Sequence, residues 1–386
     1  MIVARTADVV IVGGGVVGAS AAYHLAAAGA GSVLLLERAD ALGTGSTGAC
    51  AGGFRQQFSS RVNILLSQAS VPMILSFTEE HGLPLDIHQE GYLFMVRSAG
   101  LWSDYLASVE LQRSMGVEVE VLTPEEARGL VPGISLDGMR GATFGPRDGI
   151  ADPSGMTQGY ATSARRVGAS IETAVEVRAV EASKGRVTGV QTSSGPISAP
   201  VVVNAAGPWA GQLAASLAVD VPLEPIPRQV VVTGPFEGRP ERRTLVIDAD
   251  STFYFHREGP GLLMGMGGRE EHASFDTRVD EGFIADELLP AAVELFPPLA
   301  AADVRHTWCG LYEMTPDRHP IIGEAPSVRG FFLANGFSGH GFQHAPVVGK
   351  LLAEMIVQGE ATTVDVSALG LERFVEGRLI RESHVV

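Results

Sequence analysis

The chain has 386 residues, 45% of them hydrophobic and 19% charged, which predicts a globular protein of about two domains. Its 44 acidic residues outnumber 28 Lys and Arg, and the formal charge of −16 argues against nucleic acid or an anionic membrane as a partner. The two cysteines, Cys50 and Cys309, form neither a CxxC motif nor a disulfide framework, so a reducing compartment is expected and we predict a cytoplasmic protein. No metal-ligating pattern is predicted.

The first regular elements lie in an uncharged run from Val9 to Leu36 that is long enough to span a bilayer. The run contains many glycines and changes its period partway, and no basic segment leads into it, so we predict neither a membrane segment nor a signal peptide. Residues 9–12 are apolar without alternation, which is typical of a strand buried on both faces. A helix over 16–28 and a second buried strand over 32–36 complete a βαβ unit.

The remaining predicted elements show two kinds of sequence pattern. A helix over 159–168, strands over 170–175, 187–192 and 197–203, a strand over 330–334 and a helix over about 342–357 continue the βα pattern. Residues 81–145 and 216–315 instead alternate strands, for example 229–233 and 262–264, with Pro and Gly turns. We therefore expect a dinucleotide-binding domain made of residues 1–80, 146–215 and 316–386. A substrate-binding domain made of 81–145 and 216–315 would cover it.

The turn after the first strand carries a dinucleotide-binding motif. Gly13-Gly14-Gly15-Val16-Val17-Gly18 fits G-x-G-x-x-G, follows a buried strand and opens a helix. Gly13 permits the tight turn, Gly15 lets the backbone approach a pyrophosphate, and Gly18 lets helix and strand pack closely. The helix N-terminus offers N–H groups to the phosphates, and Glu37 at the end of the second strand can accept hydrogen bonds from a ribose diol.

A second glycine-rich segment favours FAD over NAD as the dinucleotide. Residues 43–53 are all small, and their N–H groups could pass close to a bulky bound group. A typical NAD site does not need such a segment, so the sequence predicts FAD.

These motifs together resemble the FAD-dependent amino-acid oxidase superfamily, which includes glycine oxidase, sarcosine oxidase, D-amino-acid oxidase and the β subunit of a heteromeric proline dehydrogenase. The resemblance runs nearly end to end and extends through residues 204–209, 308–317 and 336–342. It implies an α/β plus α+β fold of two domains: a Rossmann-like βαβ FAD domain and a substrate domain whose antiparallel sheet lies over the flavin.

The resemblance also implies which residues hold FAD. Val177 would contact the adenine through its backbone and Gly207 would approach the cofactor. Gly339 to Phe342 would start the last helix at the pyrimidine edge of the flavin, where a helix N-terminus stabilises the charge of the reduced ring. The remaining cofactor-binding candidates are Arg38, Ser46, Thr47, Ala51, Gly52, Gly53, Ala206, Trp209, Gly310, His340, Gly341 and Gln343.

The substrate side has a separate set of candidates. Arg55 falls where sarcosine oxidase-like members bind a substrate carboxylate, and the planar guanidinium suits that task. Tyr312 falls where glycine and D-amino-acid oxidases place their carboxylate arginine, and this departure favours secondary amines over glycine or D-amino acids. The other candidates for substrate binding or catalysis are Gln57, Tyr254, His256, His340 and Gln343.

Two departures from the sarcosine oxidase pattern bear on the chemistry. Those members use a lysine to activate oxygen, whereas Lys184 falls in an expected turn and Lys350 deep in the last helix, which favours a dehydrogenase. Monomeric sarcosine oxidase attaches FAD to a cysteine, where this chain has Gly310 preceded by Cys309, so we predict non-covalent FAD.

The predicted activity is oxidation of a small amine or amino acid by hydride transfer to flavin N5, giving an imine that hydrolyses. Secondary or N-methyl amino acids such as sarcosine, dimethylglycine or proline are the expected substrates, and oxygen, a quinone or a partner subunit the acceptor. Four alternatives remain: a flavin-bearing subunit of a heteromeric dehydrogenase, a glycine or D-amino-acid oxidase, a nicotinamide-dependent dehydrogenase and a flavin-dependent hydroxylase. An oligomer is also possible.

Overall fold

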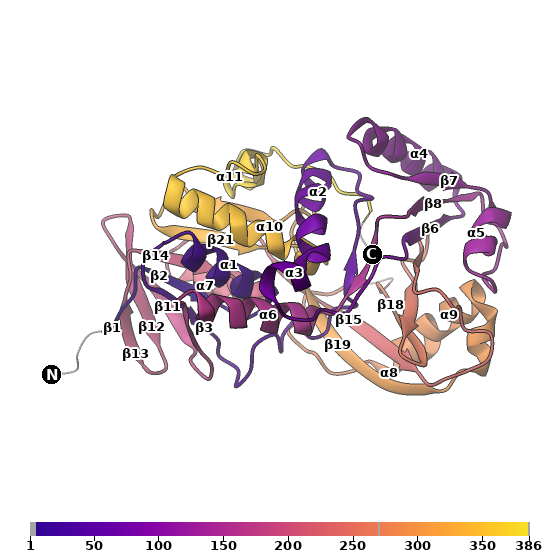
Figure 1. Cartoon of the computed structure of the whole chain (residues 1–386), viewed down its shortest axis with the longest axis horizontal. Helices are drawn as coiled ribbons and strands as arrows, with labels where there is room; N and C mark the ends of the chain where they lie inside the picture. The colour runs from indigo at the N-terminus through magenta and orange to yellow at the C-terminus, as the bar shows by residue number, and fades with distance from the viewer. Residues whose placement is uncertain (1–4, 269–270, 385–386) are drawn as a thin grey trace.

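The computed structural model describes residues 5–268 and 271–384 of the chain. Its elements form two halves that lie side by side, one built on a six-stranded sheet and the other on an eight-stranded sheet (Figure 1). After helix α11 (Glu372–Val375), the last described segment runs back to the middle of the molecule beside helix α2 (Arg61–Leu75) (Figure 1). Within the described ranges, no helix is long and apolar enough to cross a membrane.

The six-stranded sheet begins with the predicted βαβ unit. Strand β2 (Val9–Val12) has the predicted bounds and is followed by α1 (Val16–Ala27) and β3 (Val33–Leu36). The sheet order is β10 (Ser170–Glu172), β3, β2, β14 (Val201–Asn204), β21 (Phe331–Asn335) and β20 (Ile321–Glu324). Neighbouring strands are parallel except β20 and β21, which pair antiparallel at one edge.

This sheet is covered on both faces, which explains why its strands are apolar without alternation. Val9 and Ile11 pack in one core with residues of α1 and α10 (Gly341–Ala353), whereas Val10 and Val12 face a second core under the four-stranded sheet. The two helices cross closely, because a Cβ atom at Gly349 of α10 would overlap Ser20 of α1. Small residues in α1 therefore set the depth at which the last helix lies.

The eight-stranded sheet forms the second half. Its order is β19 (Val304–Met314), β15 (Glu224–Thr233), β18 (Gly261–Met266), β17 (Tyr254–Glu258), β16 (Leu245–Asp248), β6 (Tyr92–Val96), β8 (Gly141–Gly145) and β7 (Glu120–Leu122). The sheet is antiparallel as expected, with one exception: β16 and β6 pair parallel, where the two separate chain segments meet.

The segments that form this sheet also contain helices that the sequence did not predict. They are α4 (Ala99–Ser114), α5 (Pro124–Leu130), α8 (Glu281–Phe283), the π-helical turn Ile284–Leu288 and α9 (Leu289–Leu295). The prediction that residues 81–145 and 216–315 alternate strands with turns therefore left these helices out. Helix α4 buries only a quarter of its residues and has weak apolar periodicity, which hid it from sequence reasoning.

Two smaller sheets and the remaining helices complete the fold. The sheets are β1 (Arg5–Thr6), β13 (Gly195–Ser198), β12 (Arg186–Thr192) and β11 (Val177–Ser183), and β4 (Gly53–Phe54), β9 (Gly149–Ala151) and β5 (Ile87–His88). The helices are α3 (Phe77–His81), α6 (Pro153–Arg166) and α7 (Ala210–Ala215), with short turns at Gly207–Trp209, Pro297–Ala301, Glu354–Gln358 and Ser367–Leu369.

Four predicted elements differ clearly from their expected bounds. The strand expected over 170–175 ends at Glu172. The strand expected over 197–203 is two strands in two sheets, β13 and β14, and Pro200 lies between them, where the missing N–H favours a break. The helix expected from residue 159 begins at Pro153, with the Asp152 side chain accepting the Ser154 N–H as its cap. The last helix starts at Gly341 and ends in a π turn at Gln358.

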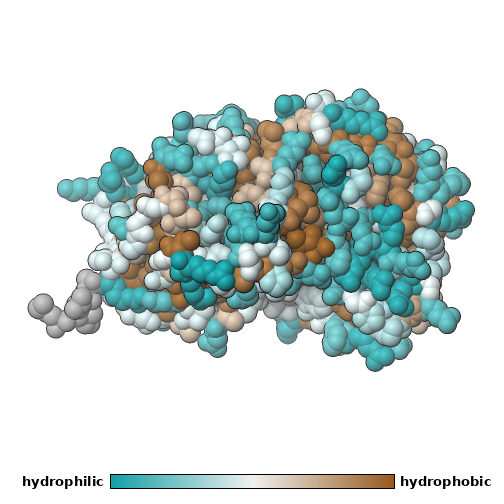
Figure 2. Space-filling view, in the orientation of Figure 1, coloured by the Kyte–Doolittle hydropathy of each residue, from teal (hydrophilic) through white to brown (hydrophobic). Residues whose placement is uncertain are grey.

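The two sheets draw on different parts of the chain. All strands of the six-stranded sheet come from residues 1–80, 146–215 and 316–386, and all strands of the eight-stranded sheet come from 81–145 and 216–315. The domain boundaries themselves stay a prediction. On the face that Figure 2 shows, hydrophilic residues predominate and apolar residues occur in separate groups.

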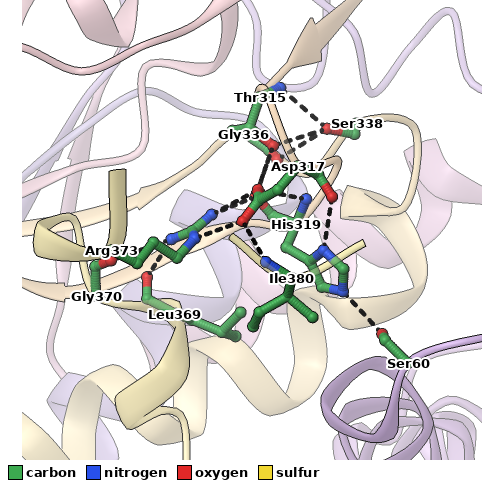
Figure 3. Close-up of polar contacts among 10 residues, drawn as sticks. All are labelled: Ser60, Thr315, Asp317, His319, Gly336, Ser338, Leu369, Gly370, Arg373 and Ile380. Atoms are coloured by element: carbon green, nitrogen blue, oxygen red, sulfur yellow. Dashed lines mark hydrogen bonds and ion pairs between the residues drawn. The ribbon is translucent and has the colours of Figure 1, made fainter. Parts of the chain in front are cut away.

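A buried ion pair joins the C-terminal segment to the turn after β19 (Figure 3). Arg373 donates to both carboxylate oxygens of Asp317, from Nε at 2.8 Å and from Nη2 at 3.0 Å, and neither side chain reaches solvent. His319, whose carbonyl also accepts from Arg373, places its ring Nε2 at 2.8 Å from Ser60 Oγ at the start of α2. The network therefore fixes the turn, the C-terminal segment and α2 relative to one another.

Replacing Arg373 with Met should lower the free energy of unfolding by about 3–5 kcal/mol, because it leaves the Asp317 carboxylate buried without its partner. Arg178→Met, which removes an exposed pair with Glu176, is the matched control and should cost less than about 1 kcal/mol. Urea unfolding of the two variants beside the unsubstituted protein measures both values. Equal small losses would contradict the role given to the buried pair.

Candidate functional site

A large cavity of about 770 Å³ lies where the two sheets face each other. One part is lined by the turns that follow β2, β3 and β14, which are the carboxyl ends of neighbouring parallel strands. The other part is lined by β15, β17, β19 and the start of α10. Ligands of α/β proteins bind at such carboxyl edges, and this volume suits an extended ligand.

Two glycines have no room for a side chain here, Gly13 in the turn after β2 and Gly18 in the first turn of α1. Gly13 has φ +111°, and a Cβ atom there would overlap the carbonyl oxygen of Ala205, which follows β14. A Cβ atom at Gly18 would overlap the carbonyl oxygen of Gly13, so helix α1 sits directly against the turn. The N-terminus of α1 opens onto the cavity at Gly15, and its first N–H, that of Val16, donates to Oγ1 of Thr47 in the glycine-rich loop at 3.1 Å.

Glu37 is held with its carboxylate at the cavity wall. Its Oε2 accepts the Gly14 N–H at 2.6 Å and its Oε1 accepts the Ala39 N–H at 2.8 Å. These bonds fix the carboxylate and leave further lone pairs for a ligand hydroxyl. Beside it, the Arg38 guanidinium carbon lies 3.7 Å from the ring centroid of Trp209, and Phe275 stacks on the same indole.

The structure brings most predicted cofactor-binding residues together. The cavity is lined by Gly13, Gly14, Gly15, Val16, Val17, Glu37, Arg38, Ser46, Thr47, Ala51, Gly53, Val177, Ala206, Gly207, Trp209, Gly310, Gly339, His340, Gly341, Phe342 and Gln343. Gly18 and Gly52 are not among the lining residues. Gly18 packs under the turn, and Gly52, with φ +76°, lies against the Ala151 carbonyl in the small three-stranded sheet.

Three tyrosines line the other part of the cavity, and each lies against a glycine. A Cβ atom at Gly53 would overlap the hydroxyl of Tyr92. In the same way, a Cβ atom at Gly265 would overlap Tyr254, and one at Gly339 would overlap the ring of Tyr312. Burial raises the pKa of all three tyrosines above the usual value, so their hydroxyls stay protonated. They can therefore donate hydrogen bonds to an anionic ligand.

Arg55 is buried, and its guanidinium is already bound within the protein. Nη1 donates to the Gln57 carbonyl, and Nη2 donates to the His384 carbonyl and lies 3.2 Å from Nε2 of His340. The guanidinium carbon is 4.1 Å from the Phe58 ring centroid. The C-terminal segment thus reaches the predicted carboxylate anchor.

His340 is a neutral donor in this arrangement. Arginine only donates, so Nε2 of His340 must accept from Arg55, and the ring proton lies on Nδ1. Within the described residues Nδ1 has no hydrogen-bond partner, although it is buried. Burial, and after it the Arg55 charge, hold the pKa of His340 well below its usual value.

Three other predicted residues are engaged elsewhere. Gln343 borders the cavity, but its amide pairs with the main chain of Arg55, accepting from N at 3.0 Å and donating to O at 3.1 Å. Gln57 lies outside the lining and donates to the Tyr92 carbonyl and Asp148. His256 also lies outside it, with its two ring nitrogens 3.0 Å from the carbonyls of Ala51 and Arg257.

Sequence reasoning did not name several polar residues that line the cavity, among them Tyr92, Arg228 and Glu313. Arg228 carried a signal, because an arginine in a buried strand is rare unless it has a partner. Glu313 lay within the motif 308–317, but nothing in the sequence showed that its side chain would face the cavity.

Glu313 presents a partly satisfied carboxyl group to the cavity. Its Oε1 accepts the Phe337 N–H at 3.3 Å, whereas Oε2 is buried and without a partner in the parts of the chain that the structure describes. Burial raises the pKa of Glu313 to about 7, although N–H groups of Gly336 and Phe337 oppose the shift. An unpaired carboxyl oxygen of this kind indicates a ligand group that completes its hydrogen bonds.

Comparison with known proteins agrees with this geometry. A family model described as FAD dependent oxidoreductase matches residues 8–355. Mitochondrial sarcosine dehydrogenase of Mus musculus is 33% identical over 385 aligned residues, which cover 96% of this chain but 41% of that protein. The chain therefore spans well under half the length of this relative.

Two solved structures are similar over almost their whole length. The L-proline dehydrogenase from P. horikoshii has a TM-score of 0.90 and 32% identity, covering 98% of this chain and 100% of that one. The glycine oxidase from Geobacillus kaustophilus has a TM-score of 0.86 and 27% identity, covering 96% and 99%. The two-domain flavoprotein fold inferred from the sequence is confirmed.

Glu313→Gln should remove a pH dependence of FAD binding. Below about pH 7 the carboxyl is neutral, and above it a negative charge faces a cavity that must receive a pyrophosphate, so the dissociation constant should rise by up to about tenfold per pH unit. Titration of the apoprotein with FAD between pH 6 and 8.5 measures the trend. The rise of the dissociation constant with pH should disappear in Glu313→Gln. It should persist in the control Glu176→Gln, because Glu176 lines the cavity but is exposed. An unchanged pH dependence in Glu313→Gln would contradict the role given to the Glu313 carboxyl.

Proposed function

Since the chain belongs to the family of FAD-dependent oxidoreductases, we propose that it oxidises a secondary or N-methyl amino acid, with sarcosine, dimethylglycine and proline as the candidates. Proteins named sarcosine dehydrogenase and L-proline dehydrogenase are among those it resembles. The observation that carries the proposal is one cavity that joins a glycine-lined dinucleotide cradle to a pocket lined by tyrosines and arginines.

The residues of the cradle fit FAD. The N-terminus of α1 would receive the pyrophosphate, Glu37 a ribose diol, and residues 175–178 the adenine. When bound, the flavin supplies an acceptor for a hydride from the α-carbon of the substrate. The N-terminus of α10, which opens at Gly341 beside the tyrosine pocket, would favour negative charge on the bound cofactor.

We propose that FAD is held without a covalent bond. Cys309 borders the cavity, but it alternates along β19 with Gly310, whose missing Cβ faces Ala49 of the glycine-rich loop. Successive side chains of a strand point to opposite faces, so the Cys309 thiol projects away from that loop. Burial also raises the pKa of this thiol, which disfavours the reactive thiolate.

The polar groups of the pocket favour a substrate that is an amine and a carboxylate. The buried guanidinium groups of Arg55 and Arg228 make a carboxylate favourable and an additional ammonium costly, so the amine would bind neutral, as loss of hydride requires. His340 does not take the amine proton, because its Nε2 accepts from Arg55; its Nδ1–H is placed to donate. The protein therefore contributes by orienting the substrate and by removing water from around it.

An acceptor other than oxygen suits the pocket. Neither of the two lysines lines the cavity: Lys184 lies in the turn between β11 and β12, and Lys350 lies in α10. This supports a dehydrogenase that passes electrons to a quinone or a partner subunit, and it keeps open a flavin-bearing subunit of a larger complex. The cytoplasmic location, the oligomeric state and the domain bounds stay predictions.

Anaerobic bleaching of the flavin tests the proposed substrate class. The purified chain, loaded with FAD, should be yellow and should be bleached by sarcosine, dimethylglycine or L-proline at least tenfold faster than by glycine or D-alanine. Turnover of the same substrate with an artificial dye would show that the chain is active alone. Faster bleaching by glycine or D-alanine would instead support an amino-acid oxidase of primary amines, and protein that takes up no flavin would contradict the proposal.

A further inference from the structure

Two arginines line the pocket, and they differ in which guanidinium N–H groups are free to bind a ligand. A guanidinium grips a carboxylate with a pair of parallel N–H bonds, either from Nη1 and Nη2 or from Nε and Nη2. Both pairs require a hydrogen on Nη2, because Nη2 lies on the side of the Nε hydrogen and Nη1 on the side of the alkyl stem. The state of Nη2 therefore decides which arginine can bind a carboxylate with two bonds.

Arg55 has no such hydrogen left. One Nη2 hydrogen is donated to the His384 carbonyl and the other to Nε2 of His340. The main-chain N–H and C=O of Arg55 are also hydrogen-bonded, both to the side-chain amide of Gln343. Arg55 is thus a fixed part of the pocket wall that ties the C-terminal segment to the start of α10.

Arg228 on β15 keeps a pair of donors. It is 7% exposed, and within the described residues its Nε has no hydrogen-bond partner. Nη2 donates one hydrogen to Glu271 at 2.6 Å and retains the other, and Nη1 makes a long 3.3 Å bond to the Pro227 carbonyl. A buried Nε–H without an acceptor is costly, which indicates that a ligand supplies the acceptor.

The surroundings of Arg228 direct it into the substrate pocket. It pairs across the sheet with Gly310, so its side chain shares the face on which Gly310 meets the glycine-rich loop. Its guanidinium carbon lies 4.9 Å from the ring centroid of Tyr312. Glu271, which is exposed, forms an ion pair with the guanidinium at 2.6 Å.

We propose that Arg228 binds the carboxylate of the amino-acid substrate, and that Arg55, the anchor expected from the sequence, positions neighbouring groups instead. The proposal rests on the proposed function, because it requires a carboxylated substrate. Arg228 would hold the carboxylate through Nε and Nη2, with the protonated tyrosine hydroxyls as further donors.

The test compares binding of (methylthio)acetate, in which sulfur replaces the amine nitrogen of sarcosine, with binding of its uncharged amide. Binding is read from the flavin absorbance of the full-length, FAD-loaded protein. The unsubstituted protein should prefer the carboxylate. Arg228→Met should weaken carboxylate binding by at least roughly 30-fold, the minimum for truncating a buried charge pair, and should leave amide binding unchanged.

Three further variants keep the test decisive. Arg228→Lys retains one charge without the fork and should fall between the unsubstituted protein and Arg228→Met. In Arg228→Ala, added guanidinium ion should restore carboxylate binding, which a merely structural role would not produce. Arg55→Met is the matched control: it should lower the melting temperature and weaken carboxylate binding several-fold less than Arg228→Met does, because Arg55 contributes charge but no free Nη2 hydrogen.

The outcomes separate this assignment from the function on which it rests. If Arg228→Met keeps the carboxylate preference while Arg55→Met loses it, Arg55 is the anchor and our assignment is wrong. If the unsubstituted, FAD-loaded protein shows no preference for the carboxylate, the proposed amino-acid substrate is wrong and Arg228 loses its role with it.

Discussion

The site depends on a backbone contact between two turns, which is possible because one of them has a glycine at the point of approach. The turn after β2 meets the turn after β14 at Gly13 and Ala205, and α1 rests on Gly13 through Gly18. Because there is no Cβ atom at either glycine, the amino end of α1 comes to the carboxyl edge of the sheet. The helix dipole, the Glu37 carboxylate and the glycine-rich loop then face one cavity.

The second sheet covers this edge and so encloses the cavity. Strand β19 brings Gly310 against Ala49 of the loop, and Tyr312 against Gly339 at the start of α10, so a glycine permits each of these two close contacts. The buried Arg373–Asp317 pair secures the turn that follows β19. Arg228, Glu313 and His340, which each have a polar atom without a partner among the described residues, all line this cavity.

The sequence predicted the parts of this design that local chemistry dictates. Strand β2 and its glycine turn were found because an apolar run, a glycine fingerprint and Glu37 stand at fixed spacings. Arg55 was placed in the pocket, but its partners lie 285 and 329 positions away at His340 and His384, and no local pattern reveals that its donors are used. Arg228 was missed although an arginine in a buried strand is a signal, because its Nε, unpaired among the described residues, is a property of the assembled sheet.

The most direct measurement of the central contact is FAD affinity in Gly13→Ala. Gly29→Ala is the control, because Gly29 also has a positive φ, +76°, but has open space around it. Both variants bear backbone strain of about 1–3 kcal/mol, and only Gly13→Ala pushes the two turns apart. The account predicts that Gly13→Ala folds but binds FAD at least tenfold more weakly than Gly29→Ala; equal affinity in the two variants would contradict it.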